Sequence, residues 1–154
     1  MSRKKRIAVY LAMPGEVDCK WIIREARLRK MRIFVPILFH RKLQFAPLEK
    51  HSIFTHNRFG VAEPAVPNRM LVSARNLDAV IVPLLGFDNK ANRIGMGGGY
   101  YDRSFAFRKY RRGWRHPLLI GVAYSFQQVD NLPTASWDVP LDVVVTEQKL
   151  LENL

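Results

Sequence analysis

An apolar run from Leu77 to Leu85 is the feature that most constrains the fold of this chain, because it is the strongest strand signal in the sequence. Ile7 to Ala12 is a second short apolar run, and the Pro14-Gly15 turn closes it. Such a run is typical of a strand buried on both faces of a sheet. We therefore expect an α/β domain in which helices cover a mostly parallel sheet.

The other strand and helix signals alternate along the chain, as the α/β class requires. Asp18 is placed to cap a helix in which Trp21, Ile22, Ala26 and Arg29 or Lys30 recur at helical spacing. A second helix is predicted over Tyr100 to Tyr110, and Lys50 to Pro67 is predicted as a long loop. The remaining predicted strands are Arg32 to Leu38, Leu43 to Ala46, Leu118 to Tyr124 and Asp142 to Thr146. The sum is a three-layer α/β/α domain.

Length and cysteine content are consistent with one intracellular domain. The 154 residues suit a single domain, residues 1–154, and are too few for two ordinary ones. The one cysteine, Cys19, excludes an intramolecular disulfide and fits a reducing compartment. The basic residues Arg3 to Arg6 and the apolar run after them imitate a secretory signal, but Pro14-Gly15-Glu16 replaces a cleavage site. We expect a cytoplasmic protein without a membrane span.

The charge of the chain favours anionic partners without choosing among them. Lysine and arginine number 25 against 13 acidic residues, a formal net charge of +12. An excess of this size attracts nucleotides, polycarboxylates, RNA or membrane surfaces. The basic residues are dispersed along the chain, so solvated faces account for most of them, and no specific nucleic acid is expected.

The segment Arg93-Ile-Gly-Met-Gly-Gly-Gly-Tyr-Tyr-Asp-Arg103 carries the clearest functional signal. Four glycines in five positions leave backbone N–H groups free to face a phosphate. Arg93 and Arg103 add positive charge, and Asp102 adds an oxygen ligand suited to Mg²⁺. The segment should also adjoin the first turn of the helix that starts at Tyr100, beyond the carboxyl ends of the strands. A simple turn is the alternative interpretation.

Neither of the common phosphate loops matches this segment. A Walker loop requires a Lys-Ser or Lys-Thr pair after the last glycine, and none follows Gly99. The dinucleotide fingerprint requires a further glycine where Tyr100 stands, and it should open the first strand–helix unit.

Five segments together resemble the 5-formyltetrahydrofolate cyclo-ligase family, also called 5,10-methenyltetrahydrofolate synthetases. They are Tyr10-Leu-Ala-Met-Pro-Gly-Glu-Val-Asp18, Asn57-Arg-Phe-Gly-Val-Ala-Glu-Pro64, Pro83-Leu-Leu-Gly-Phe-Asp88, the glycine segment 93–103 and Trp137-Asp-Val-Pro-Leu-Asp-Val-Val-Val-Thr146. The resemblance implies a NagB/RpiA/CoA transferase-like fold. It also implies the cyclisation of 5-formyltetrahydrofolate, in its monoglutamate or polyglutamate form, with ATP and Mg²⁺. The formyl oxygen would first take the γ-phosphate of ATP, and N10 would then displace it.

The resemblance also assigns residues to this reaction. The ATP-binding residues would be Arg93, Ile94, Gly95, Met96, Gly97, Gly98, Gly99, Tyr100 and Tyr101. The folate-binding residues would be Leu11, Glu16, Phe59, Met96, Gly97, Gly98, Gly99 and Tyr100. Asp102 and Asp138 would hold Mg²⁺, and the candidate catalytic residues are Arg93, Tyr100 and Asp102. Without the resemblance, we would interpret Glu16 as a solvated turn residue. Phe59 would be a loop-packing residue about as readily as a folate-binding one. Asp142 would support the site, and Arg58 would meet a folate carboxylate or a phosphate.

Two departures from the family pattern leave alternatives open. Family members usually have a helical segment before the first strand, with a cation that reaches the ATP phosphates, and we expect this chain to lack it. Ala91 stands where the family commonly has glycine. An impaired folate- or nucleotide-binding relic is therefore the second hypothesis. A basic nucleic-acid-binding protein, motivated by the net charge alone, is the third.

Overall fold

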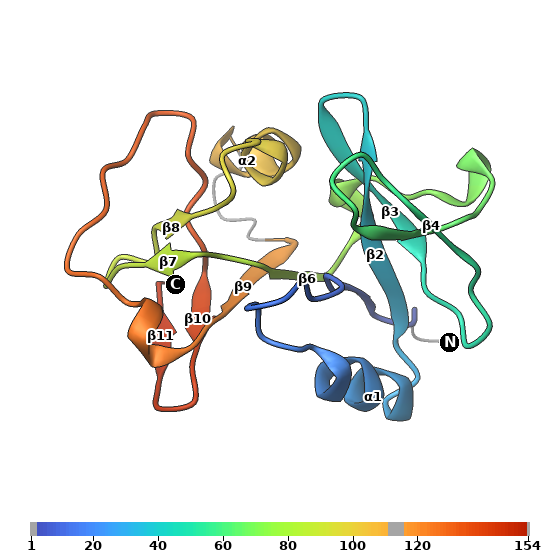
Figure 1. Cartoon of the computed structure of the whole chain (residues 1–154), viewed down its shortest axis with the longest axis horizontal. Coiled ribbons are helices and arrows are strands. Elements are labelled where there is room, and N and C mark those ends of the chain that lie inside the picture. Colours follow the sequence, from blue (N-terminus) through green and yellow to red (C-terminus); the bar gives the residue numbers. More distant parts are fainter. Residues whose placement is uncertain (1–2, 111–115, 154) are drawn as a thin grey trace.

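A computed structural model describes residues 3–110 and 116–153 and places one mixed sheet at the centre of the molecule (Figure 1). Its strands are β1 (Arg6–Ala8), β2 (Arg32–Phe39), β3 (Lys42–Pro47), β6 (Ala79–Val82), β9 (Leu118–Val122), β10 (Val143–Val145) and β11 (Leu150–Glu152). Their order in space is β11-β10-β9-β6-β1-β2-β3. The strands from β10 to β2 run parallel, and an antiparallel strand closes each edge. The prediction of a mostly parallel sheet is confirmed.

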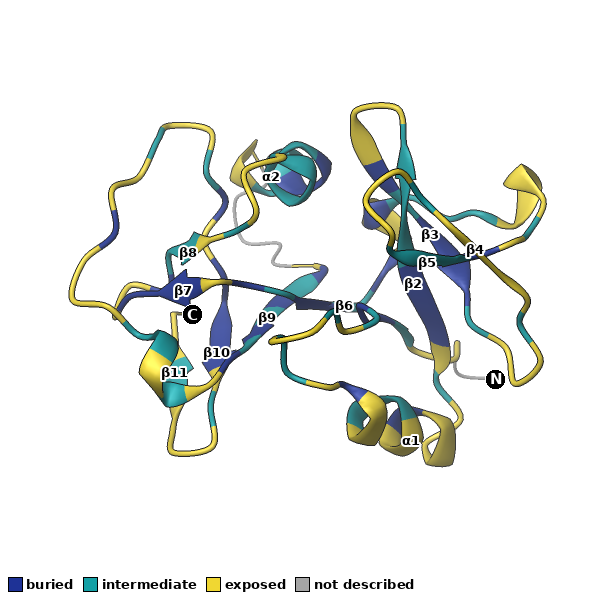
Figure 2. Ribbon diagram, viewed as in Figure 1, coloured by how far each residue is buried: buried dark blue, intermediate teal, exposed yellow. Residues whose placement is uncertain are grey.

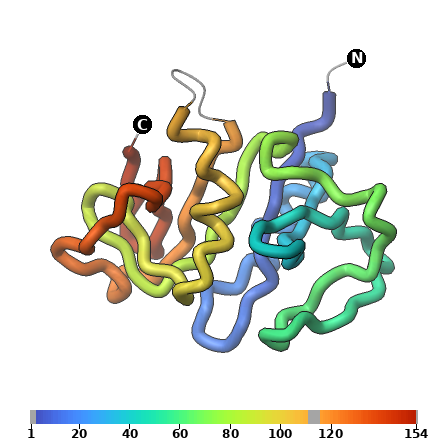
Figure 3. Tube along the Cα trace, turned by 90° about the horizontal axis from the view of Figure 1, so that it is seen from above, coloured from blue at the N-terminus to red at the C-terminus, as the bar shows by residue number. Residues whose placement is uncertain are grey.

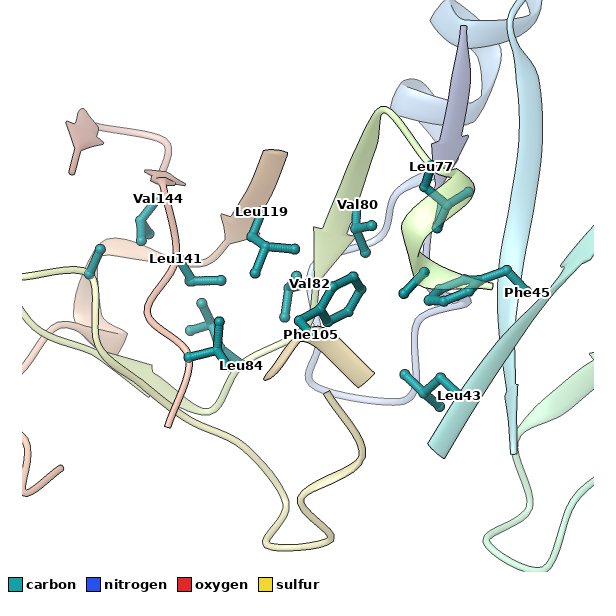
Figure 4. Packing of buried hydrophobic residues seen from close by; sticks show 14 of the residues in the cluster. Leu43, Phe45, Leu77, Val80, Val82, Leu84, Phe105, Leu119, Leu141 and Val144 are labelled. Atoms are coloured by element: carbon teal, nitrogen blue, oxygen red, sulfur yellow. The ribbon is translucent and has the colours of Figure 1, made fainter. Parts of the chain in front are cut away.

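The two α-helices lie on opposite faces of this sheet, α1 (Lys20–Leu28) below and α2 (Tyr100–Phe105) above it in Figure 1. Successive residues of a strand point to opposite faces, so β6 supplies both cores. Val80 and Val82 pack in the larger cluster with Phe105 of α2, and Figure 4 shows these side chains directed toward one another. Ile81 points the other way, into a smaller cluster with Ala26 of α1. Burying each such apolar side chain stabilises the fold by about 1.5–3 kcal/mol.

The helix α1 starts close to the predicted cap, and Ile22 and Ala26 of the predicted inward face pack in the smaller core, but Trp21 does not. The backbone N–H of Lys20 donates to Asp18 Oδ1 at 3.0 Å, which also lowers the pKa of Asp18. The residue at the N-cap is Cys19, which makes no side-chain capping bond. Ala26 is the buried residue of α1, whereas Trp21 is 71% exposed. Trp21 is therefore not a core residue, although its spacing placed it on the apolar face.

The predicted long loop over residues 50–67 is wrong in part, because it contains a hairpin of β4 (Phe54–His56) and β5 (Ala62–Pro64). Strands of three residues with an exposed face give no periodic signal, which is why the sequence did not indicate them. A second short hairpin, β7 (Gly86–Phe87) with β8 (Arg93–Ile94), leads into the glycine segment.

The longest apolar run also forms a shorter strand than predicted, since β6 ends at Val82. Leu84 is still buried in the larger core, although it lies beyond the strand. Helix α2 likewise ends at Phe105 and continues as a 3-10 helix, η3 (Ala106–Tyr110). Apolar character therefore predicted burial better than it predicted the ends of elements.

The sheet has a topological switch point between β1 and β6. The chain runs from β1 to β2 on one side, and β6 occupies the other side of β1. Ligands in open α/β sheets bind beyond the carboxyl ends of the strands at such a point. Figure 3 shows three loops at this end of the molecule: the loop after β1, the tip of the β4–β5 hairpin and the glycine segment. Much of their surface is exposed (Figure 2). Among the described residues, no helix combines the length and apolar character needed to cross a membrane.

Candidate functional site

The glycine segment forms a bare loop that ends in the first turn of α2, as predicted. Gly97 and Gly99 have φ angles of +88° and +69°, a region that residues with a side chain rarely adopt, and Gly99 is the N-cap of α2. Gly98 is required for a different reason, since a Cβ there would lie 2.8 Å from Cδ2 of Tyr100. Gly97 and Gly98 are exposed and carry no side chains of their own, which leaves their backbone accessible as a phosphate-binding loop needs.

Arg93 is the cation that this loop leaves available. Its side chain lies against the loop, because a Cβ on Gly95 would come within 2.7 Å of Arg93 Nη1. Its guanidinium also lies over the ring of Tyr101, 5.2 Å from the centroid. No acidic side chain pairs with Arg93 among residues 3–110 and 116–153. An anion bound at the loop would therefore be its ionic partner.

Arg103, the second arginine of the segment, has a structural role instead. Its Nε donates to the backbone oxygen of Arg41 at 2.6 Å, and its Nη2 donates to the backbone oxygen of Gly98 at 2.7 Å. The guanidinium also covers the ring of Tyr100 at 5.1 Å. Arg103 thus joins the glycine loop to the β2–β3 turn, and the positive charge expected beside the glycines is bonded to backbone oxygens.

Asp102 and Asp138 come from different elements, which meet at the hydrogen bond between Asp102 and Val139. Asp102 belongs to the first turn of α2, and its Oδ1 accepts the backbone N–H of Val139 at 3.0 Å. Asp138 precedes Val139, and its Oδ2 accepts the N–H of Ala135 at 2.8 Å. Each half-buried carboxylate therefore has one oxygen fixed by the backbone. In the described part of the chain, the other oxygen of each has no hydrogen-bond donor.

This pair of acids fits a magnesium ion that is bound together with a phosphate. Mg²⁺ in nucleotide sites takes one or two carboxylates, with phosphate oxygens and water as the remaining ligands. No cluster of three or more His, Cys, Asp or Glu that could hold a metal occurs among the described residues. The donor set therefore suits a metal that is shared with a nucleotide rather than enclosed by protein.

The loop after β1 brings Glu16 and Leu11 to the same end of the sheet. Glu16 closes the turn, since its Oε2 accepts the N–H of Met13 at 2.8 Å, while Tyr10 donates its hydroxyl to the backbone oxygen of Val17. Burial raises the pKa of Tyr101, and the charge of Glu16 contributes to the increase. Leu11 is half-buried beside this turn. Part of the Glu16 carboxylate thus serves the turn, and its second oxygen remains for a ligand.

The tip of the β4–β5 hairpin reaches the same place from the other side. The guanidinium of Arg58 donates to the hydroxyl of Tyr100, and the ring of Phe59 meets the ring of Tyr100 edge-on at 6.3 Å. Phe59 is 57% exposed. An exposed aromatic beside Tyr100 leaves an apolar surface that a flat ligand ring can cover.

Asp142 does not face the candidate metal site. It is buried, and both of its oxygens lie 2.7 Å from Arg108 Nη2. Its Oδ2 also accepts the N–H of Leu119. The ion pair joins residues 34 positions apart in the chain, so no local sequence signal indicates the role of Arg108.

The chain is similar to known folate enzymes over most of its length. The model of the 5-formyltetrahydrofolate cyclo-ligase family matches residues 1–147. Enzymes named 5-formyltetrahydrofolate cyclo-ligase from Haemophilus influenzae and Escherichia coli K12 are 36% and 34% identical to this chain. The alignments cover 92% and 95% of this chain and 75% and 80% of those proteins. The Aquifex aeolicus 5,10-methenyltetrahydrofolate synthetase has a similar structure, with a TM-score of 0.75, 32% identity, and coverage of 97% of this chain and 72% of that one.

Proposed function

The chain belongs to the 5-formyltetrahydrofolate cyclo-ligase family, and we propose that it converts 5-formyltetrahydrofolate to 5,10-methenyltetrahydrofolate with ATP. One observation supports this most strongly. The bare glycine loop, the unpaired Arg93 and the Asp102–Asp138 pair occupy one end of the sheet, beside the loop that carries Glu16. Phosphate groups, a metal and a pterin ring can all be held there.

The proposed reaction proceeds in two steps. The formyl oxygen attacks the γ-phosphorus of ATP, the bond to the bridging oxygen breaks, and ADP leaves. N10 then attacks the activated formyl carbon, loses its proton, and phosphate departs with the former formyl oxygen. Phosphoryl transfer of this kind depends on positioning and charge stabilisation, so no enzyme nucleophile is required.

Arg93 and the amides of the glycine loop would hold the phosphates in this reaction. The guanidinium of Arg93 supplies a fixed cation where negative charge accumulates on the transferred phosphoryl group. Tyr100 and Tyr101 adjoin that position, and burial keeps the Tyr101 hydroxyl protonated by raising its pKa. Ile94, Gly95, Met96 and the glycines that follow complete the proposed ATP-binding set.

Asp102 and Asp138 would hold Mg²⁺ against the nucleotide. In each residue, the carboxylate oxygen that is not bonded to the backbone would be the metal ligand. When it is bound, the ion neutralises charge on the β- and γ-phosphate oxygens.

Glu16, Leu11 and Phe59 would bind the folate. A carboxylate can accept two hydrogen bonds from the amino-pyrimidinone edge of the pterin, and Phe59 with Tyr100 can cover its face. Met96, 74% exposed at the glycine loop, would border the same ligand.

We also infer that residues 1–154 form a single cyclo-ligase domain and that this domain has a NagB/RpiA/CoA transferase-like fold. One central sheet with helices on both faces supports both statements. A cytoplasmic location is also part of the proposal, and the single cysteine supports it.

An assay with ATP, Mg²⁺ and 5-formyltetrahydrofolate tests the function directly. We expect the near-ultraviolet absorbance of methenyltetrahydrofolate to appear only when all three are present. 5-Methyltetrahydrofolate is the matched control, because it lacks the formyl oxygen that must accept the phosphate. A folded protein that binds both ligands without turnover would contradict the proposal.

A further inference from the structure

We propose that Arg108 and Lys109 are positioning residues that hold the loop carrying Asp138 against the helical segment carrying Asp102 and so set the geometry of the proposed magnesium site. This inference rests on the proposed function, because it assigns the two carboxylates to a metal. It concerns residues that face away from the ligands and act through the loop that carries Asp138.

Three contacts from one helical segment fasten that loop. Asp102 in α2 accepts the N–H of Val139, Lys109 in η3 donates its ammonium to the backbone oxygen of Ser136, and Arg108 pairs with Asp142. Ser136 precedes Asp138 by two residues, whereas Val139 and Asp142 follow it. The α2–η3 segment therefore fixes the chain on both sides of Asp138.

The Arg108–Asp142 pair is a buried ion pair, unlike the exposed contact of Lys109. The two side chains are 9% and 6% exposed, and both oxygens of Asp142 lie 2.7 Å from Arg108 Nη2. Asp142 is itself fixed to the sheet, since Leu119 donates its N–H to Oδ2 at 2.7 Å. Salt screens a buried pair only weakly, so this anchor persists at physiological ionic strength.

These contacts between the α2–η3 segment and the loop that carries Asp138 matter because two carboxylates must be correctly placed to bind one metal ion. Asp102 lies on α2 and Asp138 on the loop that these contacts attach to the α2–η3 segment, so a free loop would change the spacing between the two carboxylates. The three contacts oppose this movement, so the carboxylates stay in place before the metal arrives. Outer contacts that orient metal ligands in this way typically change metal affinity by about 10–100-fold when they are removed.

Two sets of variants test the proposal. Arg108→Met combined with Asp142→Asn removes the buried ion pair, leaves no unpaired charge, and keeps a side-chain oxygen that can accept the N–H of Leu119. Lys109→Ala removes the contact to Ser136, and Lys109→Arg restores a donor. Lys50→Ala, an exposed lysine in a distant turn, matches the charge change of Lys109→Ala. Binding of Mn²⁺ in the presence of ATP is followed by electron paramagnetic resonance, and folate binding by calorimetry.

We expect the paired variant to bind Mn²⁺ about tenfold or more weakly than the parent while it binds 5-formyltetrahydrofolate equally well. Lys109→Ala should weaken Mn²⁺ binding several-fold, and Lys109→Arg should recover most of it. Folded variants with parental Mn²⁺ affinity would overturn the positioning role alone. If the variant substituted at both Arg108 and Asp142 does not fold, Mn²⁺ binding by the Lys109 variants tests the positioning role. A parent protein that turns over without any divalent metal would overturn the metal site and this inference together.

Discussion

Arg93 and Arg103 flank the same glycines, yet the fold gives them different tasks. Arg103 directs its donors to the backbone oxygens of Arg41 and Gly98, whereas Arg93 has no acidic partner in the described residues. A guanidinium that already bonds two carbonyls stabilises the loop more than it attracts a ligand. Arg93 is therefore the arginine we expect to meet the phosphates.

Substitution of the two carboxylates tests the chemistry at the scale of single residues. Asp102→Asn keeps an oxygen that can accept the N–H of Val139, so we expect the melting temperature to change little. The lost negative charge should lower kcat/KM on the order of a hundredfold, since the metal and the phosphates lose a ligand. Asp138→Asn should behave alike in the steady-state assay. Asp130→Asn, at an exposed acid, is the matched control, and a full-activity Asp102→Asn enzyme would contradict the assignment.

Ala91 shows why a glycine suits this position in the loop before Arg93. It has a φ angle of +58° and is fully buried in the larger core. The left-handed conformation costs a residue with a side chain roughly 1–2 kcal/mol. The buried methyl group packs with the core and offsets part of this cost, which allows alanine where glycine would be easier.

At the scale of elements, the β4–β5 hairpin is positioned by one acid. Glu63 Oε1 accepts the N–H of Leu38 in β2 at 2.8 Å and the side-chain amide of Asn57 at 3.0 Å. The hairpin is thereby tied to the central sheet, and its tip is carried to Tyr100.

Two phenylalanines of this hairpin provide a matched test of the folate surface. Phe59 at the tip is 57% exposed, and Phe54 at the base is 40% exposed. We expect Phe59→Ala to raise KM for 5-formyltetrahydrofolate about fivefold, because a stacking surface worth about 1 kcal/mol is lost. KM for ATP should stay within about twofold. Phe54→Ala should change neither constant, and equal effects of both substitutions would assign the change to the hairpin as a whole.

At the scale of the whole molecule, Asp88 links two loops that frame the site. It is 1% exposed and accepts hydrogen bonds from the backbone of Lys90, Asn92 and Leu132, and from the Asn92 side chain. Burial acts to raise the pKa of Asp88, but these hydrogen bonds outweigh it and hold the pKa below its ordinary value.

The direction of this shift predicts how stability depends on pH. A carboxyl with a lower pKa in the folded state stabilises the fold above its ordinary pKa of about 4. The stabilisation is lost as the pH falls through the folded-state pKa. We expect the melting temperature to decline below about pH 4, and Asp88→Asn to remove this part of the decline. The variant should also be less stable by about 2–3 kcal/mol at pH 7. Asp130→Asn should leave the melting temperature unchanged both at pH 7 and below about pH 4. If the melting temperature of Asp88→Asn depends on pH as in the parent protein, this role of Asp88 is wrong.

The sequence by itself determined which parts of the chain are buried, that the sheet is mostly parallel, and that residues 93–103 form a loop leading into a helix. Each of these properties depends on residues close together in the chain: apolar runs, glycines and the spacing of helical faces. The family assignment followed from the same local motifs.

Tertiary structure alone decided how distant residues combine. The sequence did not indicate the Arg108–Asp142 pair, the attachment of Arg103 to Arg41, or the contact of Arg58 with Tyr100, because partners 34 to 62 positions apart are brought together only by the strand order. The short β4 and β5 strands escaped prediction for a related reason. Their conformation comes from pairing with each other and anchoring to β2, and periodicity within three residues cannot report it.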